Sequence, residues 1–128
     1  MKVLLLEPDE YYQSQLLELL GREFDVITAR DRSSAENLFN STAPDMLVSE
    51  LMLSDGPSFE FLEKLRRDPN NSTLPIIIFS QISTLPDIEA ALTIGVNGYF
   101  VKGQNHVNDV KKLLLNLTPE AHTADNAS

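Results

Sequence analysis

Residues 44–50 read Pro44-Asp45-Met46-Leu47-Val48-Ser49-Glu50, so that a short apolar run follows a proline and ends at an acidic residue. Similar runs, rich in leucine or β-branched residues, recur between longer segments of helical period. They lack strict polar–apolar alternation, which is typical of strands buried on both faces of a parallel sheet. We expect strands at residues 3–6, 24–28, 46–48, 74–79 and 99–101. The pattern predicts about five βα units and a doubly wound α/β fold.

The segments between these runs place apolar residues at helical spacing. The first predicted helix, residues 11–20, has Leu16, Leu17 and Leu20 on its inner face. A second helix is expected over residues 33–40. The later helices are predicted from their apolar stripes, which are Phe59, Leu62 and Leu65; Ile88, Ala91 and Leu92; and Val107, Val110, Leu113, Leu114 and Leu117.

The composition indicates one globular domain. The chain has 128 residues with 42% hydrophobic content, which is enough to form a core, and it has no cysteine for disulfides or thiolate chemistry. After Thr118-Pro119 the sequence turns small and polar, without an apolar period. We therefore expect a domain over residues 1–117 and a polar tail or linker over residues 118–128.

Charge and hydropathy argue against several classes of partner. A formal net charge of −9 opposes binding to nucleic-acid phosphates and to anionic lipid. The apolar run at the N-terminus ends at Glu7, and it is too short for a signal peptide or a membrane span. We expect a cytoplasmic protein that binds neither nucleic acid nor membrane.

Polar residues follow the predicted strands. Because parallel strands joined by right-handed crossovers all point the same way, the residues after them gather at one edge of the sheet. These residues are Glu7, Asp9, Glu50, Ser80 and Lys102. Charged residues at strand ends also simply face water in many proteins. Both interpretations stay open, although the mixture of carboxylate, hydroxyl and ammonium groups favours a functional site.

Several motifs, in this order along the chain, resemble those of the receiver domain of bacterial response regulators. They are Leu4-Leu5-Leu6-Glu7, residues 44–53, residues 74–80 and Gly98-Tyr99-Phe100-Val101-Lys102. The resemblance extends nearly without gaps from Lys2 to about Leu117. It implies a flavodoxin-like (βα)5 fold with strand order 2-1-3-4-5 and a role in two-component signal transduction.

In that family, a strand-end aspartate accepts a phosphoryl group from a histidine kinase, and an acidic pair holds Mg²⁺. Glu50 stands at the acceptor position, and Glu7 matches the first acid of the pair, but Pro8 replaces the second. Phosphoryl transfer depends on positioning, and the extra methylene of Glu50 moves its carboxylate forward by about an ångström. Pro8 offers no side-chain oxygen, so we expect weak or absent Mg²⁺ binding and no other cofactor.

The other pocket positions match the family more closely. Ser80 and Lys102 stand where a hydroxyl and a lysine contact the phosphoryl oxygens. Tyr99 stands where an aromatic ring swings with the state of that hydroxyl. Gly103 and Ser54 replace prolines of the family, and the resemblance therefore predicts looser loops at both places.

Glu50 suggests mimicry of the phosphorylated state, because its carboxylate is expected within reach of Lys102 and Ser80. The mimicry would be incomplete, since a phosphate brings close to two charges and three acceptor oxygens. The alternative is a static ion pair between Glu50 and Lys102. Asp9 also has two interpretations, as a substitute metal ligand or as the N-cap of the first helix.

Enzymatic chemistry is not indicated. His106 and His122 have no second ligand at metal spacing, no histidine in the motif region serves Ser80 as a base, and the glycines form no phosphate loop. We expect a phosphorylation-independent receiver-like module that binds a protein partner or a second copy through the fourth helix, the fifth strand and the fifth helix. The alternatives are a receiver still phosphorylated by a histidine kinase or an acyl phosphate, and a flavodoxin-like domain that binds a small ligand.

Overall fold

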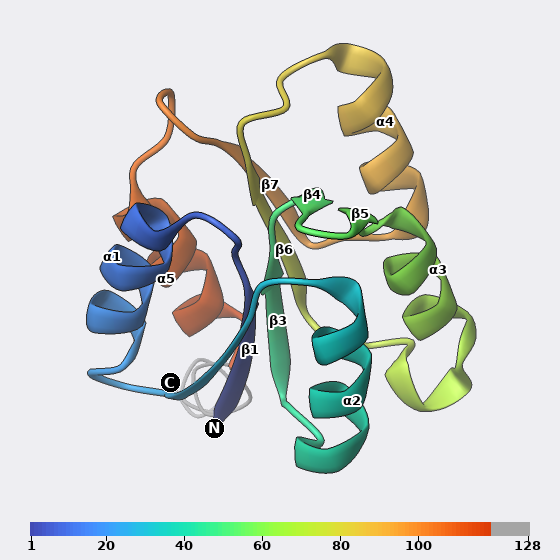
Figure 1. Cartoon of the computed structure of the whole chain (residues 1–128), viewed down its shortest axis with the longest axis horizontal. Coiled ribbons are helices and arrows are strands. Elements are labelled where there is room, and N and C mark those ends of the chain that lie inside the picture. The colour runs from blue at the N-terminus through green and yellow to red at the C-terminus, as the bar shows by residue number, and fades with distance from the viewer. Residues whose placement is uncertain (119–128) are drawn as a thin grey trace, which may run out of the picture.

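The computed structural model describes residues 1–118, which form a sheet of five parallel strands (Figure 1). Along the chain these strands are β1 (Lys2–Leu6), β2 (Asp25–Ala29), β3 (Met46–Ser49), β6 (Ile76–Ser80) and β7 (Gly98–Val101). Their order in the sheet is β2-β1-β3-β6-β7. In this register, Leu5 lies beside Thr28 on one side and Val48 on the other. The doubly wound fold and the predicted strand order are confirmed.

Helices cover both faces of the sheet (Figure 1). They are α1 (Glu10–Leu20), α2 (Arg32–Thr42), α3 (Phe59–Arg67), α4 (Leu85–Ile94) and α5 (Val107–Asn116), with a 3-10 turn at Pro69–Asn71. Alternate residues of β1 divide the core. Val3 and Leu5 pack on the side of α1 and α5, whereas Leu4 and Leu6 pack on the side of α2, α3 and α4. The central strands are therefore buried on both faces.

Some boundaries and inner faces differ from the prediction. β6 begins after Pro75, whose ring nitrogen has no hydrogen to donate to a neighbouring strand. Leu17 on α1 is 43% exposed and Leu92 on α4 is 51% exposed, although both were expected inside. Each follows a buried residue, Leu16 or Ala91, and is turned from it by about 100° around the helix. The buried stripes are thus narrower than the runs of apolar residues.

The loop after β3 folds into a small antiparallel ribbon that sequence reasoning did not predict. Its strands are β4 (Met52–Leu53) and β5 (Gly56–Pro57). Ser54 N donates a hydrogen bond to Arg30 O at 3.1 Å, and Asp55 accepts one from Arg32 N at 2.7 Å, at the start of α2. The bond from Arg32 is the largest cause that lowers the pKa of the Asp55 carboxyl. These bonds tie the loop to the start of α2, and the expectation that it is looser than in other members of the family stays a prediction.

The loop that contains Gly103 is also tied down. Asn105 Oδ1 accepts a hydrogen bond from Val101 N at 2.8 Å, and Asn105 N donates to Val101 O at 2.8 Å. Gly103 adopts a φ of 87°, which proline cannot reach. The glycine therefore permits a tight turn here, and the expectation of a loop looser than in the family stays a prediction.

Arg66 joins three parts of the α3–α4 side of the fold. Its Nη1 atom donates to Asn71 O and Leu74 O, at 2.8 and 2.7 Å, in the segment that leads into β6. Its Nη2 atom donates to Gly95 O at 2.8 Å, where α4 ends. Burial lowers the pKa of this guanidinium. One side chain thus satisfies the carbonyls of Leu74 and Gly95 and adds a second donor to Asn71 O, which also accepts from Leu74 N at 3.2 Å.

We expect Arg66→Met to lower the free energy of unfolding by about 1.5–3 kcal/mol, the range for hydrogen bonds to a charged group. The aliphatic stem is kept, but the carbonyls lose their donor. Arg67→Met is the matched control, because the neighbouring Arg67 makes only an exposed ion pair with Glu63 at 3.2 Å. It should change stability by less than about 0.5 kcal/mol in urea unfolding. Equal effects of the two variants would contradict this role of Arg66.

Candidate functional site

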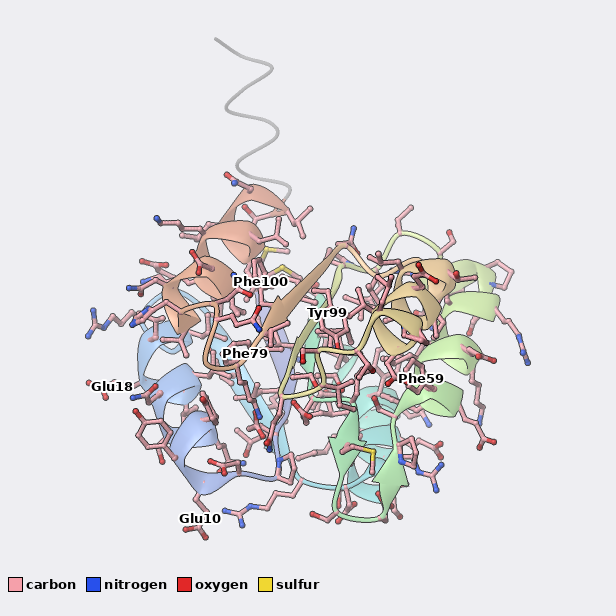
Figure 2. The ribbon with its side chains drawn as sticks, turned by 90° about the horizontal axis from the view of Figure 1, so that it is seen from above. Glu10, Glu18, Phe59, Phe79, Tyr99 and Phe100 are labelled. Atoms are coloured by element: carbon pink, nitrogen blue, oxygen red, sulfur yellow. The ribbon has the colours of Figure 1, made fainter. Side chains whose placement is uncertain are left out.

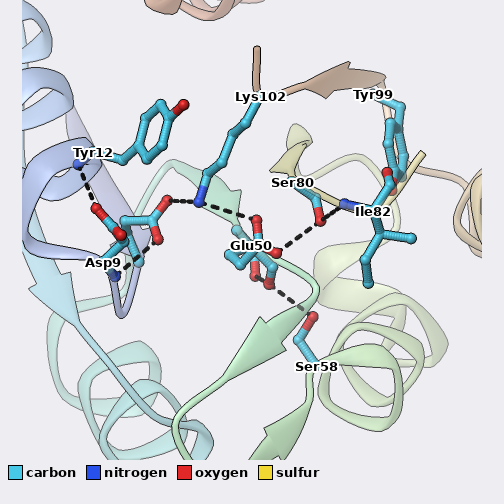
Figure 3. A network of polar contacts seen from close by, with 10 residues as sticks. Asp9, Tyr12, Glu50, Ser58, Ser80, Ile82, Tyr99 and Lys102 are labelled. Atoms are coloured by element: carbon cyan, nitrogen blue, oxygen red, sulfur yellow. Dashed lines mark hydrogen bonds and ion pairs between the residues drawn. The ribbon is translucent and has the colours of Figure 1, made fainter. Parts of the chain in front are cut away.

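Four of the predicted site residues meet at the carboxyl edge of the sheet (Figure 3). Glu7 follows β1, Glu50 follows β3, Ser80 ends β6 and Lys102 follows β7. The main chain continues the sheet pairing at three of them, since Glu7 N donates to Ala29 O, Glu50 N to Leu6 O and Lys102 N to Ser80 O, at 2.8–2.9 Å. Their side chains therefore start from fixed points of the sheet.

The three charged side chains form a buried cluster. Only 1% of Glu7, 4% of Glu50 and 9% of Lys102 is exposed. Lys102 Nζ lies 2.7 Å from Glu7 Oε1 and 3.3 Å from Glu50 Oε2. Because both acids face a single ammonium group, one negative charge is uncompensated when both are ionised.

Tyr12 covers the ammonium group from a third direction. Lys102 Nζ lies 4.5 Å from the centre of the Tyr12 ring and 5.9 Å from that of Phe79, the geometry of a cation–π interaction. Sequence reasoning missed Tyr12. The available signal was its place on the first turn of the helix after β1, at the same edge of the sheet.

The carboxylate of Glu50 also contacts Ser80. Ser80 Oγ donates to Glu50 Oε1 at 2.8 Å, so the two oxygens of Glu50 face a hydroxyl and an ammonium group respectively. Oε2 makes no aligned hydrogen bond within the described part of the chain. The main-chain carbonyl of Glu50 accepts from two further hydroxyls, those of Ser49 and Ser58, at 2.7 and 3.1 Å. Sequence reasoning did not identify these two serines.

A chain of hydrogen bonds leads from Glu50 to Tyr99 (Figure 3). Ser80 Oγ accepts from Ile82 N at 3.0 Å, and the Tyr99 hydroxyl donates to Ile82 O at 2.6 Å. Tyr99 packs with the α2, α3 and α4 side of the core, opposite to Phe100 on the same strand (Figure 2). Burial is the main cause that raises the pKa of the Tyr99 phenol, so this hydroxyl remains a donor at neutral pH.

Asp9 stands apart from the buried cluster. Its side chain is exposed, and Oδ1 accepts from Tyr12 N at 3.1 Å as the N-cap of α1. Only its backbone N–H reaches the cluster, where it donates to Glu7 Oε2 at 3.1 Å. The structure thus shows the capping interpretation of Asp9. His106 is exposed and caps α5, and His122 lies outside the described residues.

Burial is the largest cause that raises the pKa of Glu7, and the nearby Glu50 carboxylate acts in the same direction. The contacts from Lys102 and from the Asp9 N–H oppose this shift. Because the native pKa lies above the ordinary value of 4.5, the folded chain keeps this proton at pH values where the unfolded chain has lost it. The stabilisation from Glu7 is full below pH 4.5 and is lost as the pH rises through the native pKa.

Residues 1–118 also show two features that bear on other kinds of site. No group of three or more His, Cys, Asp or Glu side chains is arranged to hold a metal ion in this part of the chain. No helix in the same range is long and apolar enough to cross a bilayer.

Comparisons with known proteins agree with the fold. The family model of the response regulator receiver domain matches residues 3–114. The chain is 29% identical over 103 residues to a 14.6 kDa protein of Leptolyngbya boryana, which covers 80% of this chain and 79% of that protein. A two-component response regulator structure from Clostridium difficile has a TM-score of 0.80 at 23% identity, covering 91% of this chain and 94% of that one.

A longer relative is the phosphate regulon transcriptional regulatory protein PhoB of Escherichia coli. It is 23% identical to this chain over 124 residues, which are 94% of this chain. The chain spans only 54% of the length of PhoB.

We expect Lys102→Met to lower the free energy of unfolding by about 3–5 kcal/mol at pH 7, because two buried carboxylates lose their cation. The loss should shrink at pH 5. Without Lys102 the native pKa of Glu7 rises further, so acid restores stability by protonating the native cluster. Urea unfolding at both pH values tests this. The control Lys111→Met removes a more exposed ion pair with Glu23 and should cost less than about 1 kcal/mol at either pH.

Proposed function

The chain belongs to the response regulator receiver domain family, and we propose that it is a phosphorylation-independent member that signals by binding a protein partner or a second copy of itself. It acts in a two-component-type pathway as an interaction module and not as an enzyme. Glu50, Ser80, Tyr99 and Lys102 hold its conformational state. The observation that carries this proposal is the contact of one carboxylate, Glu50, with both Ser80 and Lys102.

That contact supports partial mimicry of a phosphorylated acceptor. By resemblance to the family, a hydroxyl and a lysine at these two positions contact the phosphoryl oxygens. Here the two carboxylate oxygens of Glu50 contact Ser80 Oγ at 2.8 Å and Lys102 Nζ at 3.3 Å. A carboxylate supplies one charge and two oxygens where a phosphate supplies close to two charges and three oxygens. Glu50 therefore engages the same groups with less charge.

The burial of Glu50 disfavours phosphoryl transfer to it. An acceptor oxygen must stand in line with the donor phosphorus, with open space in front of it. Glu50 is 4% exposed, with Oε1 directed at Ser80 and Oε2 at Lys102. A donor would have to displace one of these contacts before it reached the oxygen.

The residues present do not fit the Mg²⁺ ion that the family implies. Pro8 has no side-chain oxygen, and the carboxylate of Asp9 is directed to the N-cap of α1. Lys102 Nζ already lies against both remaining carboxylates, those of Glu7 and Glu50. The ammonium group supplies the positive charge at this edge of the sheet.

The proposed interaction surface lies on α4, β7 and α5, where the resemblance to the family places partner contacts. Leu85 and Leu92 are the most exposed large apolar side chains of α4. Tyr99 belongs to β7 and joins this surface to Glu50 through the bonds to Ile82 and Ser80. A change at Glu50 can therefore alter the position of Tyr99 at the surface through these hydrogen bonds.

We expect no phosphate adduct after incubation of the chain with acetyl phosphate and Mg²⁺, as measured by intact mass. Neither the lengthened acceptor nor the incomplete metal site supports in-line transfer. A stoichiometric adduct would overturn the proposal in favour of a receiver that is still phosphorylated. The double variant Pro8→Asp/Glu50→Asp is the positive control, and it should gain a Mg²⁺-dependent adduct. If it gains none, substitutions other than these two block transfer.

We expect Glu50→Gln to change the self-association or partner binding of the chain. The amide can still accept from Ser80, but it removes the charge that faces Lys102. Sedimentation velocity over a range of concentrations measures self-association, and hydrogen exchange of residues 82–99 reports on the route to Tyr99. Glu60→Gln, at an exposed acid of α3, is the control for loss of one negative charge. Indistinguishable behaviour of Glu50→Gln and the parent in both measurements would reduce Glu50 to a structural residue.

A further inference from the structure

A groove lies between α1 and the loop that joins β7 to α5, outside the Glu50 cluster. It has a volume of about 360 Å³, within the range of small-molecule sites. Three aromatic residues line it, Tyr11, Tyr12 and Phe79, together with Gln15, Gln104 and His106. None of the described residues that line this part of the groove has a formal charge when His106 is neutral. This surface suits an uncharged, partly aromatic molecule.

The aromatic residues form a connected row. Tyr11 and Tyr12 meet edge to face with ring centres 5.3 Å apart, and Tyr12 meets Phe79 in the same way at 5.5 Å. Tyr11 is 63% exposed although its ring is large and apolar. An exposed tyrosine is a suitable surface for stacking, because a side chain with two torsion angles loses little conformational entropy on binding.

His106 supplies a directed hydrogen-bond donor. Its Nδ1 atom accepts from Asn108 N at 3.1 Å, so in the neutral ring the proton resides on Nε2. Within residues 1–118, Nε2 has no hydrogen-bond partner. The cap of α5 thus sets the tautomer of the neutral ring and leaves an N–H without a bond on a residue that lines the groove, where an acceptor such as a ring nitrogen or a carbonyl oxygen suits it.

The groove continues along α1 toward a more polar end. A second hollow of about 240 Å³ shares Gln15 and His106 with the first and extends to Glu18 and Arg22. The carboxylate of Glu18 and the guanidinium group of Arg22 can form hydrogen bonds with hydroxyl groups at this end. An anionic ligand would meet a chain of net charge −9.

From these features we propose that the groove binds a neutral nucleoside-type molecule. Its heteroaromatic ring stacks on Tyr11 and accepts a hydrogen bond from His106, and its hydroxylated part extends toward Glu18 and Arg22. Tyr12 also covers Lys102, so a ligand that moves Tyr12 would change a contact of the Glu50 cluster. Only this effect on the Glu50 cluster rests on the proposed signalling function; ligand binding does not.

Titration of the isotope-labelled full chain with adenosine and with riboflavin, followed by NMR, tests the proposal. At least one of them should shift the amide signals of residues 11–22 and 103–108 saturably. Adenosine monophosphate should bind more weakly than adenosine because of the repulsion between its phosphate and the chain. Absence of saturable shifts with both neutral probes would overturn the proposal, and tighter binding of the monophosphate would contradict a neutral ligand.

Variants distinguish a loss of binding at the groove from a loss caused by a general change in the fold. Tyr11→Ala should weaken binding about fivefold or more through the loss of stacking. His106→Asn keeps a side-chain cap for α5 but removes the Nε2 donor, and it should also weaken binding. Leu17→Ala, at another exposed position of α1 that does not line the groove, should leave the affinity unchanged. Equal affinities of all variants would overturn the placement in this groove.

Discussion

The placement of one ammonium group determines how this edge of the sheet is built. Lys102 contributes the cation that two buried carboxylates from neighbouring strands share, at 2.7 and 3.3 Å. Burying such charges is costly unless each finds a partner, and the Coulomb gain depends on geometry. Here the geometry comes from the fold, since the backbones at Glu7, Glu50 and Lys102 are fixed by hydrogen bonds to adjacent strands. The cluster is therefore a consequence of strand order as much as of residue identity.

The same cluster joins two sides of the domain that are otherwise separated by the sheet. On the α1 and α5 side, the Tyr12 ring covers Lys102. On the α3 and α4 side, Glu50 connects through Ser80 and Ile82 to Tyr99. The link to Tyr12 is a cation–π contact, and the links to Tyr99 are hydrogen bonds in buried or part-buried settings, where polar groups without partners are costly. A displacement of Lys102 or Glu50 would thus change contacts on both faces of the sheet.

The sequence was sufficient for the layout of the domain and insufficient for several details of the site. Short apolar runs that end at Glu7, Glu50 and Lys102 predicted the strands and their common edge, because period and direction are local properties. The cover of Tyr12 over Lys102 and the contact of Arg66 with Gly95 O join segments that meet only in three dimensions. The ribbon of β4 and β5 is local, but its strands of two residues each are too short to show a period. Leu17 and Leu92 were misplaced because neighbouring apolar residues on a helix point in directions about 100° apart.

The departures at positions 8 and 50 are best understood together. An aspartate at position 8 alone would add a third carboxylate beside Glu7 and Glu50, with only Lys102 to compensate them. An aspartate at position 50 alone would shorten the side chain by one methylene and withdraw it from Ser80 and Lys102. Lys102 would then keep the Glu7 carboxylate, and Ser80 would keep the bond from Ile82 N. The long acid and the missing ligand therefore complement one another. With Glu7 and Glu50 facing Lys102, and Glu50 also contacting Ser80, the edge of the sheet carries a polar network formed by side chains of the chain itself.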